Sequence, residues 1–262
     1  MKRVSILFGL WMTLCSSAQA VPFVFSTGNP NGQFAAGSRA PSAGFLAIDA
    51  ADDFLLPLQT TLHGATFTGL LPSSASAASI SEVIVEIYRV FPLDSTNPPA
   101  GHVPTRVNSP ADVDFVSRDS ANSSLNFTFS VVSTSFVAGN SVLNGINPFP
   151  NQTTGGEGPL SAEAGTFNVI FATPIVLASG HYFFVPKVRL SSGNFYWLSA
   201  AKPIVAPGTP FVGDQQAWIR NANLAPDWLR IGTDIVGGTP QYNLAFSISG
   251  DDDRIFGDGF GT

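Results

Sequence analysis

The stretch Glu82-Val-Ile-Val-Glu-Ile-Tyr-Arg-Val-Phe91 decides the fold class, because its side chains alternate with a period of two. In an extended chain they fall on an apolar face with Val83, Val85 and Ile87 and a polar face with Glu82, Glu86 and Tyr88. We therefore predict a strand whose apolar face meets a core and whose polar face meets solvent.

The same alternation recurs along the chain, and no segment shows a convincing helical period. The further predicted strands are 45–48, 54–56, 61–71, 125–133, 166–177, 181–190, 194–199, 217–220 and 242–249. Turn clusters rich in Gly, Pro, Asn and Ser separate them, and a long Pro-rich loop covers 92–124. Many short strands of this kind predict an all-β fold, an antiparallel β-sandwich of the jelly-roll type, as a single domain over 21–250.

The first 20 residues have the pattern of a signal peptide. Lys2 and Arg3 precede an apolar run that is too short to span a bilayer, and the small residues before Val21 suit cleavage after Ala20. We expect a secreted or periplasmic protein with no membrane span once this segment is removed. The only cysteine, Cys15, leaves with it, so the mature domain must rely on its core and not on disulfides.

Composition describes a core-forming, acidic chain with 22 Phe and only 11% charged residues. Removing Lys2 and Arg3 from the 12 basic residues leaves 10 against 18 acidic residues, a net charge of −8. Phosphate-rich partners would be repelled, so we expect neither nucleic acid nor anionic membranes as partners. The sequence does not predict an oligomeric state.

Six motifs in a fixed order resemble a group of uncharacterised secreted bacterial β-sandwich proteins, many of which carry a PEP-CTERM-type sorting tail. The motifs are Ala51-Asp-Asp-Phe54, His63-Gly-Ala-Thr-Phe-Thr-Gly69, Val85-Glu-Ile-Tyr88, Ala178-Ser-Gly-His-Tyr182, Trp197 with its strand, and Leu244-Ala-Phe-Ser-Ile-Ser-Gly250. The resemblance covers about 50–250 and implies an exported β-sandwich.

The chain departs from that group after Gly250, where no apolar run long enough to anchor it follows. An acidic tail, 251–262, ends instead in Arg254-Ile-Phe-Gly-Asp-Gly-Phe260, which resembles a short C-terminal signature on secreted proteins of some gammaproteobacteria. Three readings stay open: an export or processing address, a frayed acidic end, or a calcium site built from the Asp residues of the tail.

No familiar catalytic motif stands out in the mature sequence. Three carboxylates, Asp52, Asp112 and Asp114, are candidates for a structural calcium site, and we expect no other cofactor. A polysaccharide or ester hydrolase remains an alternative, with His102, Asp112 and Asp114 of the long loop as its candidate catalytic groups.

The most specific candidate site lies near the C-terminus. Two indoles, Trp218 and Trp228, flank a polar segment, and sugar rings stack their apolar faces on such side chains. Hydroxyl groups would be bound by Arg220, Asn221, Asn223 and Asp227. We thus expect a non-catalytic protein that binds a surface or matrix polysaccharide, or another envelope component, with exposed indoles; a purely structural surface or matrix role is a further alternative.

Overall fold

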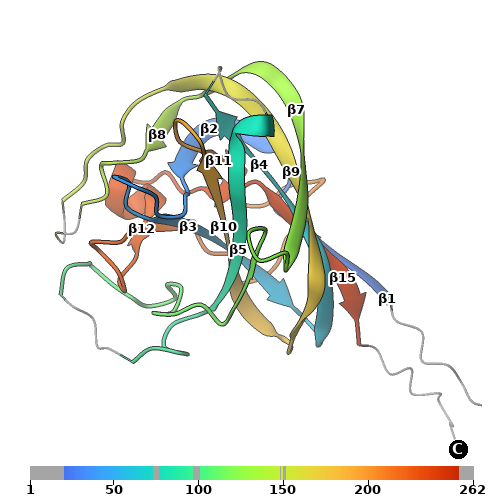
Figure 1. Cartoon of the computed structure of the whole chain (residues 1–262). Coiled ribbons are helices and arrows are strands. Elements are labelled where there is room, and N and C mark those ends of the chain that lie inside the picture. The colour runs from blue at the N-terminus through green and yellow to red at the C-terminus, as the bar shows by residue number, and fades with distance from the viewer. Residues whose placement is uncertain (1–20, 73–76, 97–100, 148, 150–151, 254–262) are drawn as a thin grey trace, which may run out of the picture.

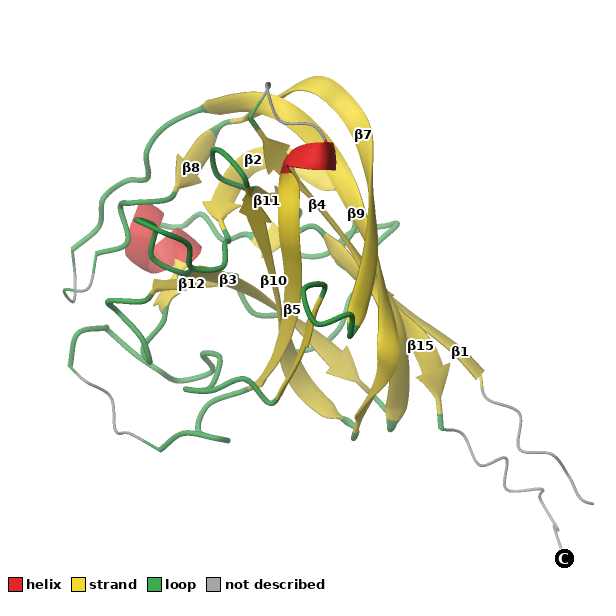
Figure 2. Ribbon diagram, viewed as in Figure 1, coloured by secondary structure: helices red, strands yellow, loops and turns green. Residues whose placement is uncertain are grey.

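The computed structural model describes residues 21–72, 77–96, 101–147, 149 and 152–253. Strands dominate it and form two sheets (Figures 1 and 2). The prediction of an all-β antiparallel sandwich is confirmed. The sheets hold nine and six strands, more than the eight strands of a simple jelly roll.

The nine-stranded sheet is built around β4. Its strands are β1 (Val21–Ser26), β2 (Pro30–Gly37), β4 (Thr60–Leu71), β7 (Leu125–Ala138), β8 (Asn140–Val142), β9 (Leu160–Leu177), β11 (Tyr196–Ala200), β14 (Asn243–Leu244) and β15 (Phe246–Asp252). One side of β4 pairs with β9, which pairs in turn with β7. The other side pairs with β15 along most of its length and with β11 at its end, so the sheet branches. Every pairing is antiparallel except that of β2 with β8.

The six-stranded sheet has the order β13-β12-β3-β10-β5-β6. Its strands are β3 (Ile48–Leu56), β5 (Ile80–Arg89), β6 (Val116–Asp119), β10 (Gly180–Leu190), β12 (Trp218–Asn221) and β13 (Leu229–Arg230). All of its pairings are antiparallel. The strand β6 lies inside the segment expected to be a long loop, 92–124, because its four residues are too few for a periodic signal.

Helical structure among the described residues is limited to a 3₁₀ turn, η1 (Ala77–Ser79), and a π-helical turn, η2 (Ile231–Val236). Neither is long enough to cross a membrane.

The core between the two sheets is largely aromatic. Phe67 and Phe167 stack with their ring centroids 4.7 Å apart, and Phe184 and Phe246 stack at 5.0 Å. Phe195 meets the first pair edge-on. Such aromatic pairs stabilise a fold beyond the area that they bury. They therefore contribute to the stability of a domain with only 11% charged residues and without a disulfide.

The two faces of β5 differ from the sequence prediction in one respect. Val83, Val85 and Ile87 are fully buried in the core, as expected. The opposite face was expected to be solvated, yet Glu82 and Tyr88 are buried there too. The prediction of a solvated face is wrong, because side chains of neighbouring strands and the segment after β5 cover it.

The C-terminal boundary also lies later than expected. Asp251 and Asp252 were assigned to the tail, but both belong to β15 and pair with Thr61 and Thr60 of β4. The Asp252 carboxylate accepts a hydrogen bond from the Thr60 hydroxyl at 3.0 Å, and Asp251 lies 2.8 Å from His63. Two of the candidate calcium ligands of the tail thus serve strand pairing. The signature starting at residue 254, the signal peptide and its cleavage position after Ala20 lie outside the described residues.

Candidate functional site

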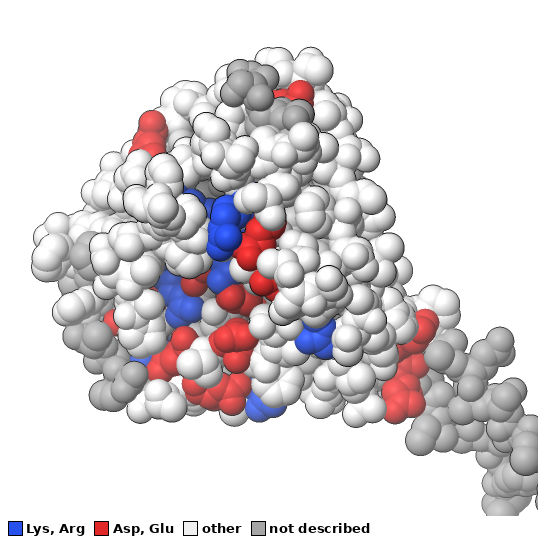
Figure 3. All heavy atoms as spheres, viewed as in Figure 1, with Lys and Arg blue, Asp and Glu red and all other residues white. Residues whose placement is uncertain are grey.

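Charged side chains gather on the outer face of the six-stranded sheet. Lys187 of β10 lies between Glu86 of β5 and Asp49 of β3; it forms an ion pair with Glu86, and its Nζ is 3.4 Å from Asp49 Oδ1. Further along the same face, Arg189 and Glu82 are 2.7 Å apart. Figure 3 shows basic (blue) and acidic (red) side chains gathered in a hollow of an otherwise mostly uncharged surface. In a chain with few charges, this concentration of ionisable side chains makes the face a candidate functional site.

Burial and neighbouring charges together shift the pKa values of the side chains in this cluster. Burial raises the pKa of the Glu86 carboxyl, and the Lys187 ammonium opposes that rise. Burial alone would lower the pKa of Lys187, but Asp49 and Glu86 together outweigh it and raise the pKa. Burial also raises the pKa of Tyr88, whose neutral hydroxyl donates to Glu86 at 2.9 Å. The cation and its two carboxylates therefore form a paired cluster.

Arg220 of β12 joins this cluster to the segment that covers the sheet. Its guanidinium donates to Asp49 at 2.9 Å and to the Tyr88 hydroxyl at 2.9 Å, and its centre lies 4.2 Å from the Trp228 ring. It also donates to the backbone carbonyl of Asp112 at 3.2 Å. Arg220 was predicted to bind hydroxyl groups of a ligand, but its donors are already used within the protein.

A second ion-pair cluster lies beside Arg220, in the segments that cover the sheet. Arg106 pairs with Asp112 and lies 3.2 Å from Asp227 Oδ1, and all three side chains are almost fully buried. The cluster joins the 101–115 segment to the turn before Trp228. Asp227, a predicted ligand-binding residue, and Asp112, a predicted calcium ligand, are therefore both committed to Arg106.

The predicted stacking platform is wrong, because both indoles are buried. Trp218 is 2% exposed and Trp228 is not exposed. They pack with Tyr88 and Phe183 in a cluster on the outer face of the sheet, and the Trp228 indole N–H donates to the Ala111 carbonyl at 3.2 Å. No sugar ring can stack on either one in this structure. Of the six predicted residues, Asn221 and Asn223 line a hollow at the surface.

That hollow lies beside a turn that the sequence did not single out. We call it the asparagine hollow; it has a volume of about 390 Å³, and its lining includes Arg39, Phe45, Leu46, Asn144, Asn221 and Asn223. A second one, the serine hollow, has about 240 Å³ and is lined in part by Arg39, Ser42, Phe45, Arg189, Ser191 and Asn194. Arg39 and Phe45 are shared, so they form the wall between the two.

The turn that carries this wall is held by local bonds. Ser42 and Phe45 exchange backbone hydrogen bonds of 3.1 and 2.9 Å across Ala43 and Gly44. Gly44 has a φ of +80°, which glycine adopts without strain. The turn leaves the Phe45 ring 51% exposed, with the Arg39 guanidinium 4.9 Å from its centroid. A large apolar ring thus stands at the surface between two polar hollows.

Arg39 is a cation without a carboxylate partner among the described residues. It donates to the Leu46 carbonyl at 3.0 Å and to the Asn194 amide oxygen, both of them neutral groups. Burial lowers the pKa of Arg39, but an arginine stays charged at any physiological pH. Its uncompensated charge is notable in a chain of net charge −6.

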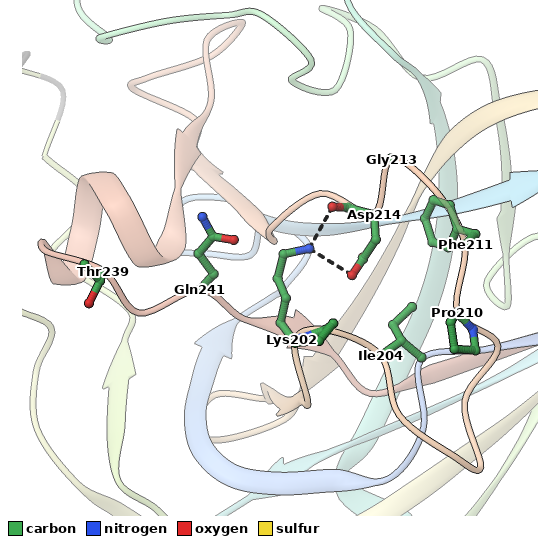
Figure 4. Close-up of a pocket in the computed structure, with 9 residues that line it drawn as sticks. Lys202, Ile204, Pro210, Phe211, Gly213, Asp214, Thr239 and Gln241 are labelled. Atoms are coloured by element: carbon green, nitrogen blue, oxygen red, sulfur yellow. Dashed lines mark hydrogen bonds and ion pairs between the residues drawn. The ribbon is translucent and has the colours of Figure 1, made fainter.

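A third hollow, of about 510 Å³, lies between the loop before β12 and the loop before β14 (Figure 4). Lys202 and Asp214 form an ion pair of 2.9 Å in its lining. The buried pair Asp52 and Asp53 lies nearby in β3: Asp52 accepts from the Leu244 backbone N–H at 2.7 Å, and Asp53 is 2.5 Å from His181. Asp53 also accepts from the Gln215 backbone N–H at 3.1 Å, so this carboxylate fastens the loop before β12 to the sheet.

The three predicted calcium ligands do not meet. Asp52 is buried against the backbone of Leu244, Asp112 pairs with Arg106, and Asp114 is exposed in the segment before β6. Nowhere in the part of the chain that the structure describes do three or more His, Cys, Asp or Glu side chains form a metal-binding group. Of the candidate hydrolytic residues, His102 and Asp114 are exposed, whereas Asp112 is buried and paired with Arg106.

Comparison with protein-family models, with curated proteins and with solved structures finds no match to this chain.

Proposed function

We propose that this chain is an exported, non-catalytic β-sandwich protein that binds a glycan bearing an anionic group, such as a uronate or a sulfated sugar. The observation that carries the proposal is the wall between the asparagine and serine hollows, where Arg39 without a carboxylate partner stands beside the exposed ring of Phe45. The ligand is thus placed at the turn before β3, not at the two tryptophans.

The chemistry of the two hollows suits a sugar. The exposed ring of Phe45 offers an apolar face on which the C–H face of a pyranose can stack. Asn144 and Asn223 are exposed, and with Asn221 they offer amide donors and acceptors for hydroxyl groups. The asparagine hollow, at about 390 Å³, falls within the range of small-ligand pockets.

The charge argument selects among sugars. Arg39 would gain a partner from a carboxylate or sulfate, because its present bonds are to neutral oxygens. Arg189, in the serine hollow, is already paired with Glu82. Arg39 is therefore the cation that we assign to the anionic group of the ligand.

The export part of the proposal rests on the leader pattern of residues 1–20 and on the ordered motifs that resemble secreted bacterial β-sandwich proteins. The absence of a catalytic role is part of the proposal. Among the described residues, Glu82 beside the serine hollow is paired with Arg189, and Glu157 beside the asparagine hollow accepts the backbone N–H groups of Leu143 and Asn144.

The test is a binding screen by calorimetry with polygalacturonate, alginate, dextran sulfate and neutral dextran. We expect the wild-type domain to bind at least one anionic polymer, and both Phe45→Ala and Arg39→Gln to weaken that binding at least tenfold. The chain offers a matched control, because Arg89 lies 3.9 Å from the ring centroid of Phe115 away from both hollows. Phe115→Ala should bind like the wild type.

Two results would overturn the proposal. One is binding that Phe45→Ala and Arg39→Gln leave unchanged, which would move the site elsewhere. The other is a domain that binds none of the anionic polymers, or that binds neutral dextran as tightly.

A further inference from the structure

The outer edge of the nine-stranded sheet is a long strand without the usual protection. Strand β7 pairs only with β9 among the described strands, and its 14 residues, LNFTFSVVSTSFVA, include no charged residue, no Pro and no Gly. Native edge strands are normally short, charged or interrupted, because a free edge recruits other strands. The other edges of the two sheets follow that rule: β1 carries Pro22, while β6, β8 and β13 have two to four residues.

The register identifies which backbone groups of β7 are free. Ala172 donates its N–H to the Ser124 carbonyl at 3.0 Å, and the same register continues from Leu125 opposite Phe171 to Val131 opposite Gly165. Hydrogen-bonded pairs alternate in an antiparallel ladder. The N–H and C=O groups of every second residue from Leu125 to Val131 therefore point away from β9, and no other described segment hydrogen-bonds to them.

The side chains at this edge are also incompletely covered. Phe127 and Phe129 point toward the core and contact the fully buried Phe167, with ring centroids 6.4 and 4.9 Å apart, yet both remain partly exposed. The strand at the corresponding edge of the other sheet, β6, has only four residues. Figure 2 shows β7 and β9 as long strands along one side of the molecule. One more strand beside β7 would cover both rings.

We propose that this edge pairs with the same edge of a second copy, antiparallel, about a two-fold axis beside Thr128. The regular part of β7 runs from Leu125 to Val131, because the register shifts after Val131, and Thr128 is its midpoint. Phe127 would then exchange both backbone bonds with Phe129 of the second copy. The proposal does not depend on the glycan site.

The uncharged edge suits a second copy as the partner. Two copies of a chain with a net charge of −6 repel each other, so their contact must bring no further like charges together. Here the strand that pairs with itself has no charge, and Thr128 would lie opposite Thr128, a cross-strand pair that stabilises sheets.

The test measures mass in solution by light scattering and sedimentation over a micromolar range of full-length processed protein. We expect a dimer, and we expect Thr128→Lys and Thr128→Glu each to weaken it at least tenfold, because like charges would then face each other across the axis. Mixing the two variants should restore a dimer of one copy of each. Thr128 is exposed, so neither variant should alter the circular dichroism spectrum.

The control is Ser249→Lys, which adds the same charge at an exposed position of β15 in the same sheet and should leave the dimer intact. A wild-type monomer at the highest concentration overturns the proposal. So does a dimer that Thr128→Lys leaves intact, and so does a failure of the Lys and Glu variants to combine.

Discussion

Replacing Arg220 with methionine is the sharpest test of the charged cluster on the outer face of the six-stranded sheet. The substitution Arg220→Met keeps an unbranched side chain against Trp228 and removes the guanidinium. The loss leaves Asp49 buried with one cation fewer, and it removes the donor from the carbonyl of Asp112. The Tyr88 hydroxyl keeps its bond to Glu86.

The size of the effect follows from these contacts. Breaking a buried ion pair by removing one partner costs about 3–5 kcal/mol. Asp49 retains Lys187 at 3.4 Å, so we expect the lower end, about 3 kcal/mol in the free energy of unfolding. For a domain of this size, such a loss corresponds to a fall in Tm of about 6–12 °C.

The assay is urea unfolding followed by tryptophan fluorescence, with the double variant Asp49→Asn/Arg220→Met as the second measurement. Removing both charges should cost less than the sum of the single variants, with a coupling of about 0.5–3 kcal/mol. A cost below about 1 kcal/mol for Arg220→Met, or strict additivity, would refute the view that this face is a desolvated network. It would also return Arg220 to the list of ligand-binding candidates.

Two further predictions concern β3 and β4. Burial, with repulsion from Asp53, raises the pKa of Asp52 well above 3.8, so the folded chain holds that proton more tightly and the stability due to it is lost as pH rises. Asp52→Asn keeps an oxygen that can accept from the Leu244 N–H. Between pH 4 and 8, the unfolding free energy of this variant should rise relative to that of the wild type. A difference that does not change with pH would contradict this prediction. Gly69→Ala should cost about 1–3 kcal/mol, because its Cβ would lie 2.2 Å from the ring of Phe195. Gly139→Ala, whose nearest contact would be 3.4 Å, is the control in the same thermal melts.

The sequence was informative for long strands that bury one face in the common core, but it did not predict β1 or β2, whose Phe25 and Phe34 are buried in that core. The alternation in β5 correctly placed Val83, Val85 and Ile87 inside, and β4 was expected within a residue of its observed start. These features are local, since an antiparallel strand with one buried face shows its pattern in its own residues.

The outer face of the same sheet could not be predicted in this way. Trp228 is buried under the 101–115 segment, Tyr88 packs against Trp228, and Glu82 is buried in its pair with Arg189 of β10. Neither the 101–115 segment nor the turn before Trp228 has a periodic pattern of its own. The alternation in β5 therefore does not indicate that other segments bury its outer face. The assignment of both tryptophans to a binding surface failed for the same reason.

The candidate hollows were missed because they depend on contacts between distant parts of the chain. Arg39 and Phe45 lie about 100 residues from Asn144 and more than 170 from Asn221, and all four line one hollow. The only local signal was the turn at Ala43-Gly44, which indicates a bend but no ligand. Asn221 and Asn223 were predicted to bind sugar hydroxyls. That stays a prediction, with Phe45 in place of the two tryptophans as the aromatic neighbour.

The pairing of β1 with β15 determines how the domain would respond to a mechanical force applied between its two ends. Val21 lies opposite Asp252, so the described chain enters and leaves at the same end of one two-strand ladder (Figure 1). Tension between the two ends would act across that ladder and open its rungs one after another, beginning at Val21, instead of shearing them all together. A domain held and loaded through both termini would yield at low force by peeling off β1, whereas one tethered by a single end would leave this seam unstressed.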